Sequence, residues 1–145
     1  MIKVLPSLKI QDKLRDLSRY QRDIMSTRFP TKYKYKFLKD AINNTTEDIR
    51  YLLAKVKKAY YKKGILEDID VKLELLRDYV RECIEDKNIS IGIKGAHYWI
   101  DLIDEIGAIV GGWLIKVKQE PQYAKNAIKG MSALISEEDI SERDI

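Results

Sequence analysis

The sequence contains very little cysteine, histidine, proline and glycine. Its 145 residues include one cysteine, one histidine, three prolines and seven glycines. One cysteine excludes an internal disulfide framework and a cysteine-based zinc site, and one histidine leaves little for a transition-metal cluster. No run approaches the roughly 20 apolar residues that a membrane span needs, and the beginning MIKVLPSLK does not read as a signal peptide. We therefore expect a soluble cytoplasmic protein without a metal or a cofactor.

Helical periodicity is the main feature of what the chain does contain. Apolar residues recur in four segments at the spacing of a helix face, where each residue advances about 100°. Pro30, Gly64 and the segment DKNISIG at residues 86–92 separate these segments, and Gly64 suits a left-handed helix cap. The expected apolar faces are Ile10, Leu14, Leu17, Ile24 and Met25; Phe37, Leu38, Ala41, Ile42, Ile49, Leu52, Leu53, Val56 and Tyr60; Ile69, Leu73, Leu76, Val80, Cys83 and Ile84; and Trp99, Leu102, Ile103, Ile106, Ile109, Val110, Trp113 and Val117.

The four segments predict a single all-α domain. Long amphipathic helices with short connections pack as an up-down-up-down four-helix bundle, which we place at residues 10–118 after a leader at residues 1–9. The last helix is expected to end near Gln119. Residues 119–145 form an acidic tail, whose last ten residues, SEEDISERDI, hold five carboxylates and one arginine. Such a composition predicts a mobile segment that the fold does not require.

Positive charge is concentrated in the first half of the chain. Residues 1–63 hold 17 Lys and Arg against 6 Asp and Glu, whereas residues 64–145 hold 10 against 17. The formal net charge of +4 therefore hides a strongly basic half. A half with this charge indicates an anionic partner.

Three glycines lie within the last predicted helix, in the stretch DEIGAIVGGW at residues 104–113. Each glycine inside a helix costs roughly 0.5–1 kcal/mol relative to alanine, so about 2 kcal/mol of helix stability is given up there. Gly107, Gly111 and Ile100 form a flat shoulder beside the apolar face, whereas Trp113 falls within that face and is expected to anchor the end of the bundle. Two glycines four residues apart let another backbone approach closely, from a neighbouring helix or from another subunit.

Two stretches, LELLRDYVRECIEDKNISIG and YWIDLIDEIGAIVGGWLIKV, resemble the third and fourth helices of the accessory variability determinant proteins of diversity-generating retroelements. These proteins belong to a wider four-helix-bundle family that includes proteins encoded by intervening sequences in large-subunit ribosomal RNA genes. The pattern is Asp-x-x-Leu-x-x-Leu-Arg-x-x-x-Arg, a loop containing Ile-Ser, and Leu-x-Glu-Ile-Gly-x-x-x-Gly-Gly-Trp. In this chain it falls on Asp70, Leu73, Leu76, Arg77, Arg81, Ile89, Ser90, Ile103 in place of leucine, Glu105, Ile106, Gly107, Gly111, Gly112 and Trp113.

The resemblance covers about residues 10–118, and its specific part is the last fifty of them. It implies a homopentameric barrel with a basic surface or pore, which binds nucleic acid and the reverse transcriptase of the retroelement. It also implies that the protein is an essential, non-enzymatic partner in the mutagenic copying of a template RNA. The acidic tail departs from the shorter and often basic C-terminus of the family.

A row of basic residues follows the second predicted helix, opposite its apolar face. Phosphate backbones favour such a row because binding releases counterions, and nearby tyrosines offer stacking surfaces for unpaired bases. The row is mostly lysine, which suits contact with the backbone of RNA, of DNA or of an RNA–DNA hybrid. An ordinary solvated helix face is the alternative interpretation. The row comprises Lys32, Lys36, Lys39, Arg50, Lys57 and Lys58, interrupted by Asp40 and Glu47 and accompanied by Tyr33, Tyr51 and Tyr61.

Arg77 and Arg81 lie at the edge of the third apolar face, close to Asp70 and Glu74 on the helical wheel. One interpretation is structural pairing, with Glu74 at i,i+3 spacing or with a carboxylate of a neighbouring helix or subunit such as Glu105. The other is contact with phosphate. The resemblance favours the second, because both arginines are part of the family's pattern.

Residues with catalytic potential are few and isolated. His97 falls on the polar side of the last helix, and Cys83 falls within an apolar face. Asp101 and Glu105 are four residues apart but have no further ligands nearby, which is too little for a metal site. We therefore expect no enzyme. Two functions stay open: a nucleic-acid-binding, oligomeric cofactor of a reverse transcriptase, and a protein-interaction bundle whose basic face meets an acidic protein or water.

Overall fold

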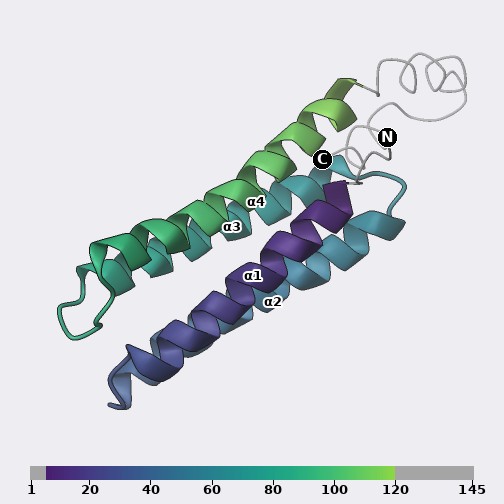
Figure 1. Cartoon of the computed structure of the whole chain (residues 1–145). Helices are drawn as coiled ribbons and strands as arrows, with labels where there is room; N and C mark the ends of the chain where they lie inside the picture. Colours follow the sequence, from purple (N-terminus) through teal and green to yellow (C-terminus); the bar gives the residue numbers. More distant parts are fainter. Residues whose placement is uncertain (1–5, 120–145) are drawn as a thin grey trace, which may run out of the picture.

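The computed structural model describes residues 6–119, which form four helices and the three short connections between them. The helices alternate in direction along the chain (Figure 1). Residues 1–5 and 120–145 lie outside the described residues, and so does the acidic tail that the sequence predicts after Gln119. The helices span Pro6–Thr27 (α1), Lys34–Lys58 (α2), Lys63–Glu85 (α3) and Ile93–Gln119 (α4).

Each helix packs against two neighbours, so the bundle is square in cross-section. α1 contacts α2 and α4, and α3 contacts the same two helices. Of these four interfaces, the one between α1 and α2 is the least extensive. Because connections of four to seven residues can join only adjacent, antiparallel helices, the structure confirms the predicted all-α, up-down-up-down bundle.

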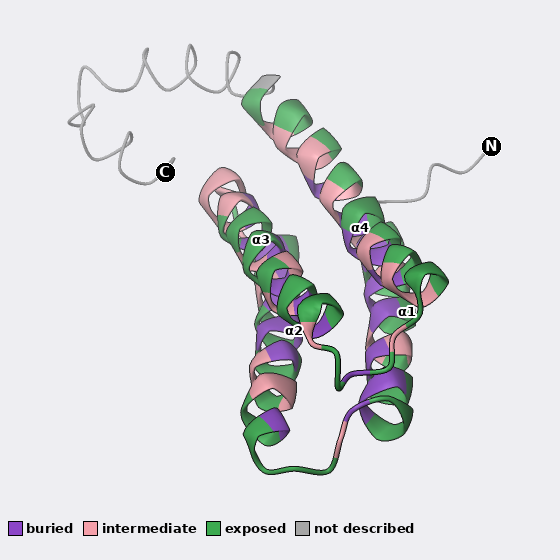
Figure 2. Cartoon of the chain, turned by 90° about the vertical axis from the view of Figure 1, so that its left-hand side faces the viewer, coloured by how far each residue is buried: buried purple, intermediate pink, exposed green. Residues whose placement is uncertain are grey.

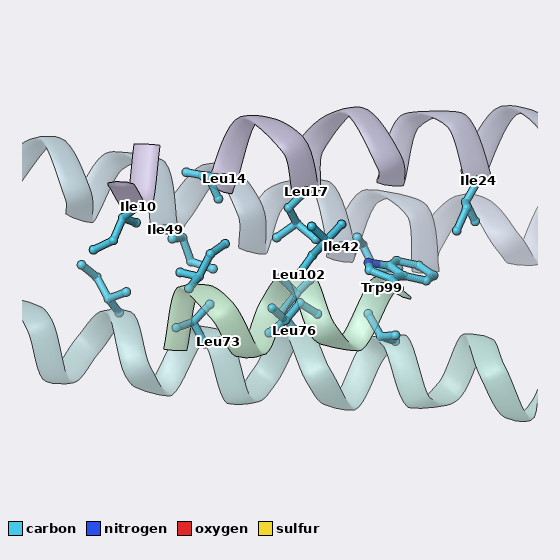
Figure 3. Packing of buried hydrophobic residues seen from close by; sticks show 14 of the residues in the cluster. Ile10, Leu14, Leu17, Ile24, Ile42, Ile49, Leu73, Leu76, Trp99 and Leu102 are labelled. Carbon is cyan, nitrogen blue, oxygen red and sulfur yellow. The ribbon is translucent and has the colours of Figure 1, made fainter. Parts of the chain in front are cut away.

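The core is one continuous cluster of apolar side chains from all four helices. Leu17, Ile42, Leu76 and Leu102 each come from a different helix and gather at the middle of the bundle (Figure 3). Trp99 is the largest fully buried side chain. The buried residues face inward along every helix, and exposed residues cover the outside (Figure 2).

Three residues expected in the apolar faces lie instead on the surface. Phe37 is 80% exposed, Tyr60 is 84% exposed and Ile84 is 41% exposed. Tyr60 follows the end of α2 at Lys58, where the helical spacing that placed it no longer holds. Phe37 lies about 140° from the buried Ile42 around α2, which turns it outward, and Ile84 lies in the last turn of α3. Trp113, expected within the core, is only partly buried against it.

Gly64 is not the helix cap that the sequence suggested. It lies within the first turn of α3, and no glycine in the described residues has a positive φ. α2 ends instead at an extended Ala59, with φ −78° and ψ 140°. Lys62 then donates from Nζ to the carbonyl oxygens of Val56 and Ala59, at 2.7 and 3.0 Å. A lysine side chain can satisfy the last carbonyls of a helix in this way, so no left-handed residue is needed.

The turn between α1 and α2 is tied to the end of α3. Tyr35 is buried, packs edge-on against the Phe29 ring at 6.5 Å, and donates a hydrogen bond to Asp86 at 3.3 Å. The backbone amide of Ser90 donates to the carbonyl of Arg28 at 3.2 Å. These contacts close the end of the bundle at which the α1–α2 and α3–α4 connections meet.

Candidate nucleic-acid interface

Basic and acidic residues lie on different pairs of helices. α1 and α2 together carry twelve Lys and Arg against six Asp and Glu, whereas α3 and α4 carry seven against ten. Because α1 packs beside α2, and α3 beside α4, the charge difference along the sequence becomes a difference between two sides of the bundle. The α1–α2 side is therefore the candidate surface for an anionic partner.

The predicted basic row of α2 is divided into two groups. Lys32 precedes α2, Lys36 and Lys39 lie in its first two turns, and Lys57 and Lys58 are its last two residues. At a rise of 1.5 Å per residue, about 27 Å separates Lys39 from Lys57 along the helix. Asp40, Glu47 and Asp48 lie between them, together with Arg50, which pairs with Glu47 at 3.3 Å. Of the six predicted residues Lys39 is partly buried and the other five are exposed.

Contacts of α2 show that the row faces α1. Lys57 donates from Nζ to Oε1 of Gln11 at 3.1 Å, and Arg50 donates from Nη2 to Oγ of Ser18 at 3.1 Å. At Arg50 and Lys57, the row therefore borders the seam between the two helices.

Three arginines of α1 add to this surface, and the sequence reasoning missed them. Arg15, Arg19 and Arg22 are exposed and spaced at i, i+4 and i+7, which places them on one face of the helix. Ser18, which accepts the hydrogen bond from Arg50, lies beside that face. The spacing was visible in the sequence, but the fact that this face borders α2 was not. These arginines and the six basic residues of the α2 row together form the α1–α2 basic face.

Exposed aromatic side chains lie near the basic residues of the α2 row. Tyr33 is 86% exposed and Tyr51 is 66% exposed, as base stacking requires. Phe37, expected in the core, joins them on the outside of α2. Tyr61 is only partly buried and packs edge-on against Tyr60, with ring centroids 4.9 Å apart.

Arg77 and Arg81 do not lie with the α2 row. Arg77 forms ion pairs with Glu74 and with Asp104 of α4, the latter at 2.8 Å, and its side chain is only 16% exposed. Arg81 pairs with Asp78 at 3.0 Å. Both arginines therefore lie among carboxylates of the α3–α4 side. The interhelical partner of Arg77 is Asp104, because Glu105, which the sequence suggested, points toward α1 and pairs with Lys13 at 2.8 Å.

The ion pair between α1 and α4 perturbs Lys13. Its hydrogen bond and Coulombic attraction to Glu105 raise the pKa of the ammonium group above its ordinary value. The pair keeps one cation of α1 engaged with α4, on the side of α1 away from the basic face.

The glycine shoulder separates into two environments. A Cβ atom on Gly107 would come within 2.8 Å of Nη2 of Arg77, so this glycine accommodates the arginine of the neighbouring helix. A Cβ atom on Gly111 or on Gly112 would meet nothing within 4 Å. Ile100, the third member of the shoulder, is partly buried. The close approach of α3 to α4 within one bundle thus explains why residue 107 is a glycine, but it does not explain the glycine at 111.

The residues with catalytic potential remain isolated in space. Cys83 is fully buried, and burial raises the pKa of its thiol to about 12. His97 is exposed on α4. Between Pro6 and Gln119, no three His, Cys, Asp or Glu side chains come together where they could hold a metal ion. Within the same span, no helix is long and apolar enough to cross a membrane.

Comparison with known proteins gives one match. A family model described as bAvd-like matches residues 8–117, which comprise nearly all of the four helices. No curated protein and no solved structure matches the chain.

Proposed function

The chain belongs to the bAvd-like family, as its resemblance to accessory variability determinant proteins predicted, and we propose that it is a non-enzymatic, nucleic-acid-binding accessory protein of a diversity-generating retroelement. In this role it binds the retroelement's reverse transcriptase and template RNA, which it holds by the backbone during mutagenic copying. The same proposal places it in the cytoplasm as a homo-oligomer, most simply a pentamer.

The observation that carries RNA binding is the gathering of positive charge on one side of the bundle. The α1–α2 basic face joins lysines of α2 to arginines of α1 across a helix seam. Each phosphate that such a face neutralises releases condensed counterions, which gives affinity for any sequence. An oligomer repeats the face once per subunit, so phosphate contacts accumulate along a bound strand.

The contribution of Arg77 and Arg81 is weaker in this proposal than the sequence suggested. Both lie on the acidic α3–α4 side, paired with carboxylates, where the excess of negative charge opposes a phosphate. We assign phosphate contact first to the α1–α2 basic face. Arg77 is assigned to holding α3 against α4.

Partnership with a reverse transcriptase is proposed first from family membership. The acidic α3–α4 side suits such a partner, because a polymerase that binds nucleic acid presents basic surfaces. With RNA on one side of the bundle and the polymerase on the other, the two partners would not compete for one surface.

A filter-binding titration against a structured RNA over a salt series tests the RNA-binding proposal. One variant replaces Lys32, Lys36, Lys39, Lys57 and Lys58 with glutamine. The control removes the same number of charges elsewhere, by replacing Lys63, Lys87, Lys94, Lys116 and Lys118. We expect the first variant to bind all RNA sequences more weakly. It should also flatten the dependence of log K on log salt by roughly 0.7–0.9 for each phosphate that the protein no longer neutralises.

The control variant should change both quantities less, and circular dichroism should show the same helix content in all three proteins. If the first variant binds RNA as tightly as the parent at low and moderate salt, the basic face is only a solvated surface. A protein-interaction bundle then becomes the better description of this chain.

A further inference from the structure

A hollow of about 480 Å³ lies between α1 and α2, in the middle of the basic face. Its size falls within the range of about 300–1,000 Å³ that is usual for small-ligand sites. It lies in the least extensive of the four helix interfaces, and small or polar residues such as Ser18, Asn43 and Thr46 line it. The hollow divides the two lysine groups of α2.

The floor of the hollow is a hydrogen-bonded network that joins three helices. Nε1 of Trp99 donates to Oε1 of Gln21 at 3.2 Å, and Nε2 of Gln21 donates to Oγ1 of Thr46 at 2.9 Å. Thr46 in turn donates to the carbonyl of Ile42 at 2.9 Å. Gln21 and Thr46 are 1% and 3% exposed. The floor is therefore fixed, with its main polar groups paired.

The rim carries side chains that still have hydrogen-bonding capacity. Arg50 donates from Nη2 to Oγ of Ser18 at 3.1 Å, and its Nε lies 3.3 Å from a carboxylate oxygen of Glu47 in an ion pair. Other N–H groups of the guanidinium group can still donate to a ligand. Arg22 reaches the same place from α1, and the Asn43 carboxamide is exposed beside it. Hydrogen-bond donors on two arginines, the Glu47 carboxylate as an acceptor, and the Asn43 carboxamide, which can donate and accept, thus line one hollow.

This combination distinguishes a nucleobase from a phosphate. A phosphate offers only acceptors and would be repelled by the Glu47 carboxylate, whereas a base edge offers donors and acceptors together. Guanine presents the O6 and N7 acceptors that arginine recognises and an amino group that a carboxylate can accept from. On this ground, and resting on the proposed function, we propose that the hollow takes one unpaired guanine base from an RNA strand whose backbone lies along the α1–α2 basic face.

The proposal adds sequence preference to a surface that otherwise recognises only the backbone. Lysines on both sides of the hollow hold the strand in either direction, and the hollow fixes its register at one base. Glu47 is the residue that selects guanine. Its carboxylate repels the phosphates of any strand, but it can accept a hydrogen bond from the amino group of guanine.

Fluorescence anisotropy with two labelled single-stranded RNAs tests this. One RNA is a uridine tract, and the other is the same tract with one central guanosine. We expect the parent to bind the guanosine-containing RNA roughly tenfold more tightly. Glu47→Ala should abolish this preference while binding the uridine tract at least as tightly as the parent does.

Asp40→Ala is the matched control, because it removes the same charge from an exposed site on α2 outside the hollow. It should strengthen the binding of both RNAs equally and keep the guanosine preference. Equal binding of the two RNAs by the parent would overturn the base site and leave the proposed function intact. The same conclusion would follow if Glu47→Ala strengthened the binding of both RNAs equally. Failure of the parent to bind either single-stranded RNA at low salt would overturn the base site, and failure to bind the structured RNA as well would overturn the proposed function.

Discussion

Gly107 gives the guanidinium group of Arg77 room to lie against the backbone of α4. The nearest guanidinium nitrogen would be only 2.8 Å from a Cβ atom at this position, and the same arginine pairs with Glu74 and Asp104. The helix stability lost by placing a glycine in mid-helix is thus offset by an interhelical ion pair in which the arginine side chain is only 16% exposed.

Replacing two glycines of α4 by alanine should separate these effects. Gly112→Ala enters open space and should raise the free energy of unfolding by about 0.5–1 kcal/mol through helix propensity. Gly107→Ala should raise it less or lower it, because Arg77 must shift. Urea unfolding measures both.

Repeating Gly107→Ala in an Arg77→Ala background provides the control. Without the guanidinium group, the alanine should give the full propensity gain. If Gly107→Ala stabilises the parent as much as Gly112→Ala does, Arg77 does not pack on this glycine.

Cys83 should behave as an inert core residue. Its side chain is fully buried, and burial raises the pKa of the thiol to about 12, above the ordinary value of 9.0. Since the thiolate is the reactive form, iodoacetamide should not label the native protein at mildly alkaline pH but should label it fully in denaturant. Mass spectrometry distinguishes the two results. Rapid labelling of the native protein would show that the end of α3 opens readily.

At the scale of the helices, a polar network sets the pairing of α1 with α2 and α4. Gln21 of α1 accepts from Trp99 of α4 and donates to Thr46 of α2. The buried hydrogen bonds require these three residues to lie at one level of the bundle. Buried polar networks of this kind contribute more to a unique arrangement of helices than to stability as such.

Gln21→Leu should lower the free energy of unfolding by roughly 1–3 kcal/mol, because the Trp99 indole N–H would stay buried without an acceptor. Trp99→Phe should cost less stability in the Gln21→Leu background than in the parent, since the indole N–H that it removes is already without an acceptor there. Thermal or urea unfolding of the two single variants and the double variant completes the cycle. Strictly additive losses would mean that the hydrogen bond contributes nothing.

At the scale of the whole molecule, the bundle has a basic side, an acidic side and, at Gly111, a glycine with open space beside it. Gly111 lies beside the core of α4, yet a Cβ atom there would meet nothing within 4 Å. Contact with another subunit would give a reason for a glycine at this position, in agreement with the proposed oligomer.

Gly111→Leu should therefore fold as the parent does but assemble less. The added side chain would overpack a contact between subunits at a cost of roughly 1–3 kcal/mol at each interface. Light scattering should show a ring-sized particle for the parent and smaller species for the variant, with unchanged circular dichroism. Gly112→Ala is the control and should assemble normally. A parent that stays a monomer at micromolar concentration would contradict the assembly.

Some features of the candidate site were predictable from the sequence and others were not. The lysine row of α2 is a local pattern, since residues three and four apart share a helix face. The α1 arginines and the hollow depend on which helix faces which across the seam. Likewise, the pairing of Glu105 with Lys13 and of Asp104 with Arg77 depends on the rotation of α4 about its axis, which periodicity places only approximately.

By itself, the sequence determined the four helices of residues 6–119, their order and most of the core, because apolar spacing, prolines and short connections act locally. It also determined that one half of the chain is basic. Only the tertiary structure decided that α1 lies beside α2, and therefore that the basic half forms one face with a polar hollow in its middle. It likewise decided that Gly107 serves Arg77 while Gly111 faces outward. The physical reason is that contacts between helices depend on side chains far apart in the chain, whose relative positions are set by the packing of the whole core.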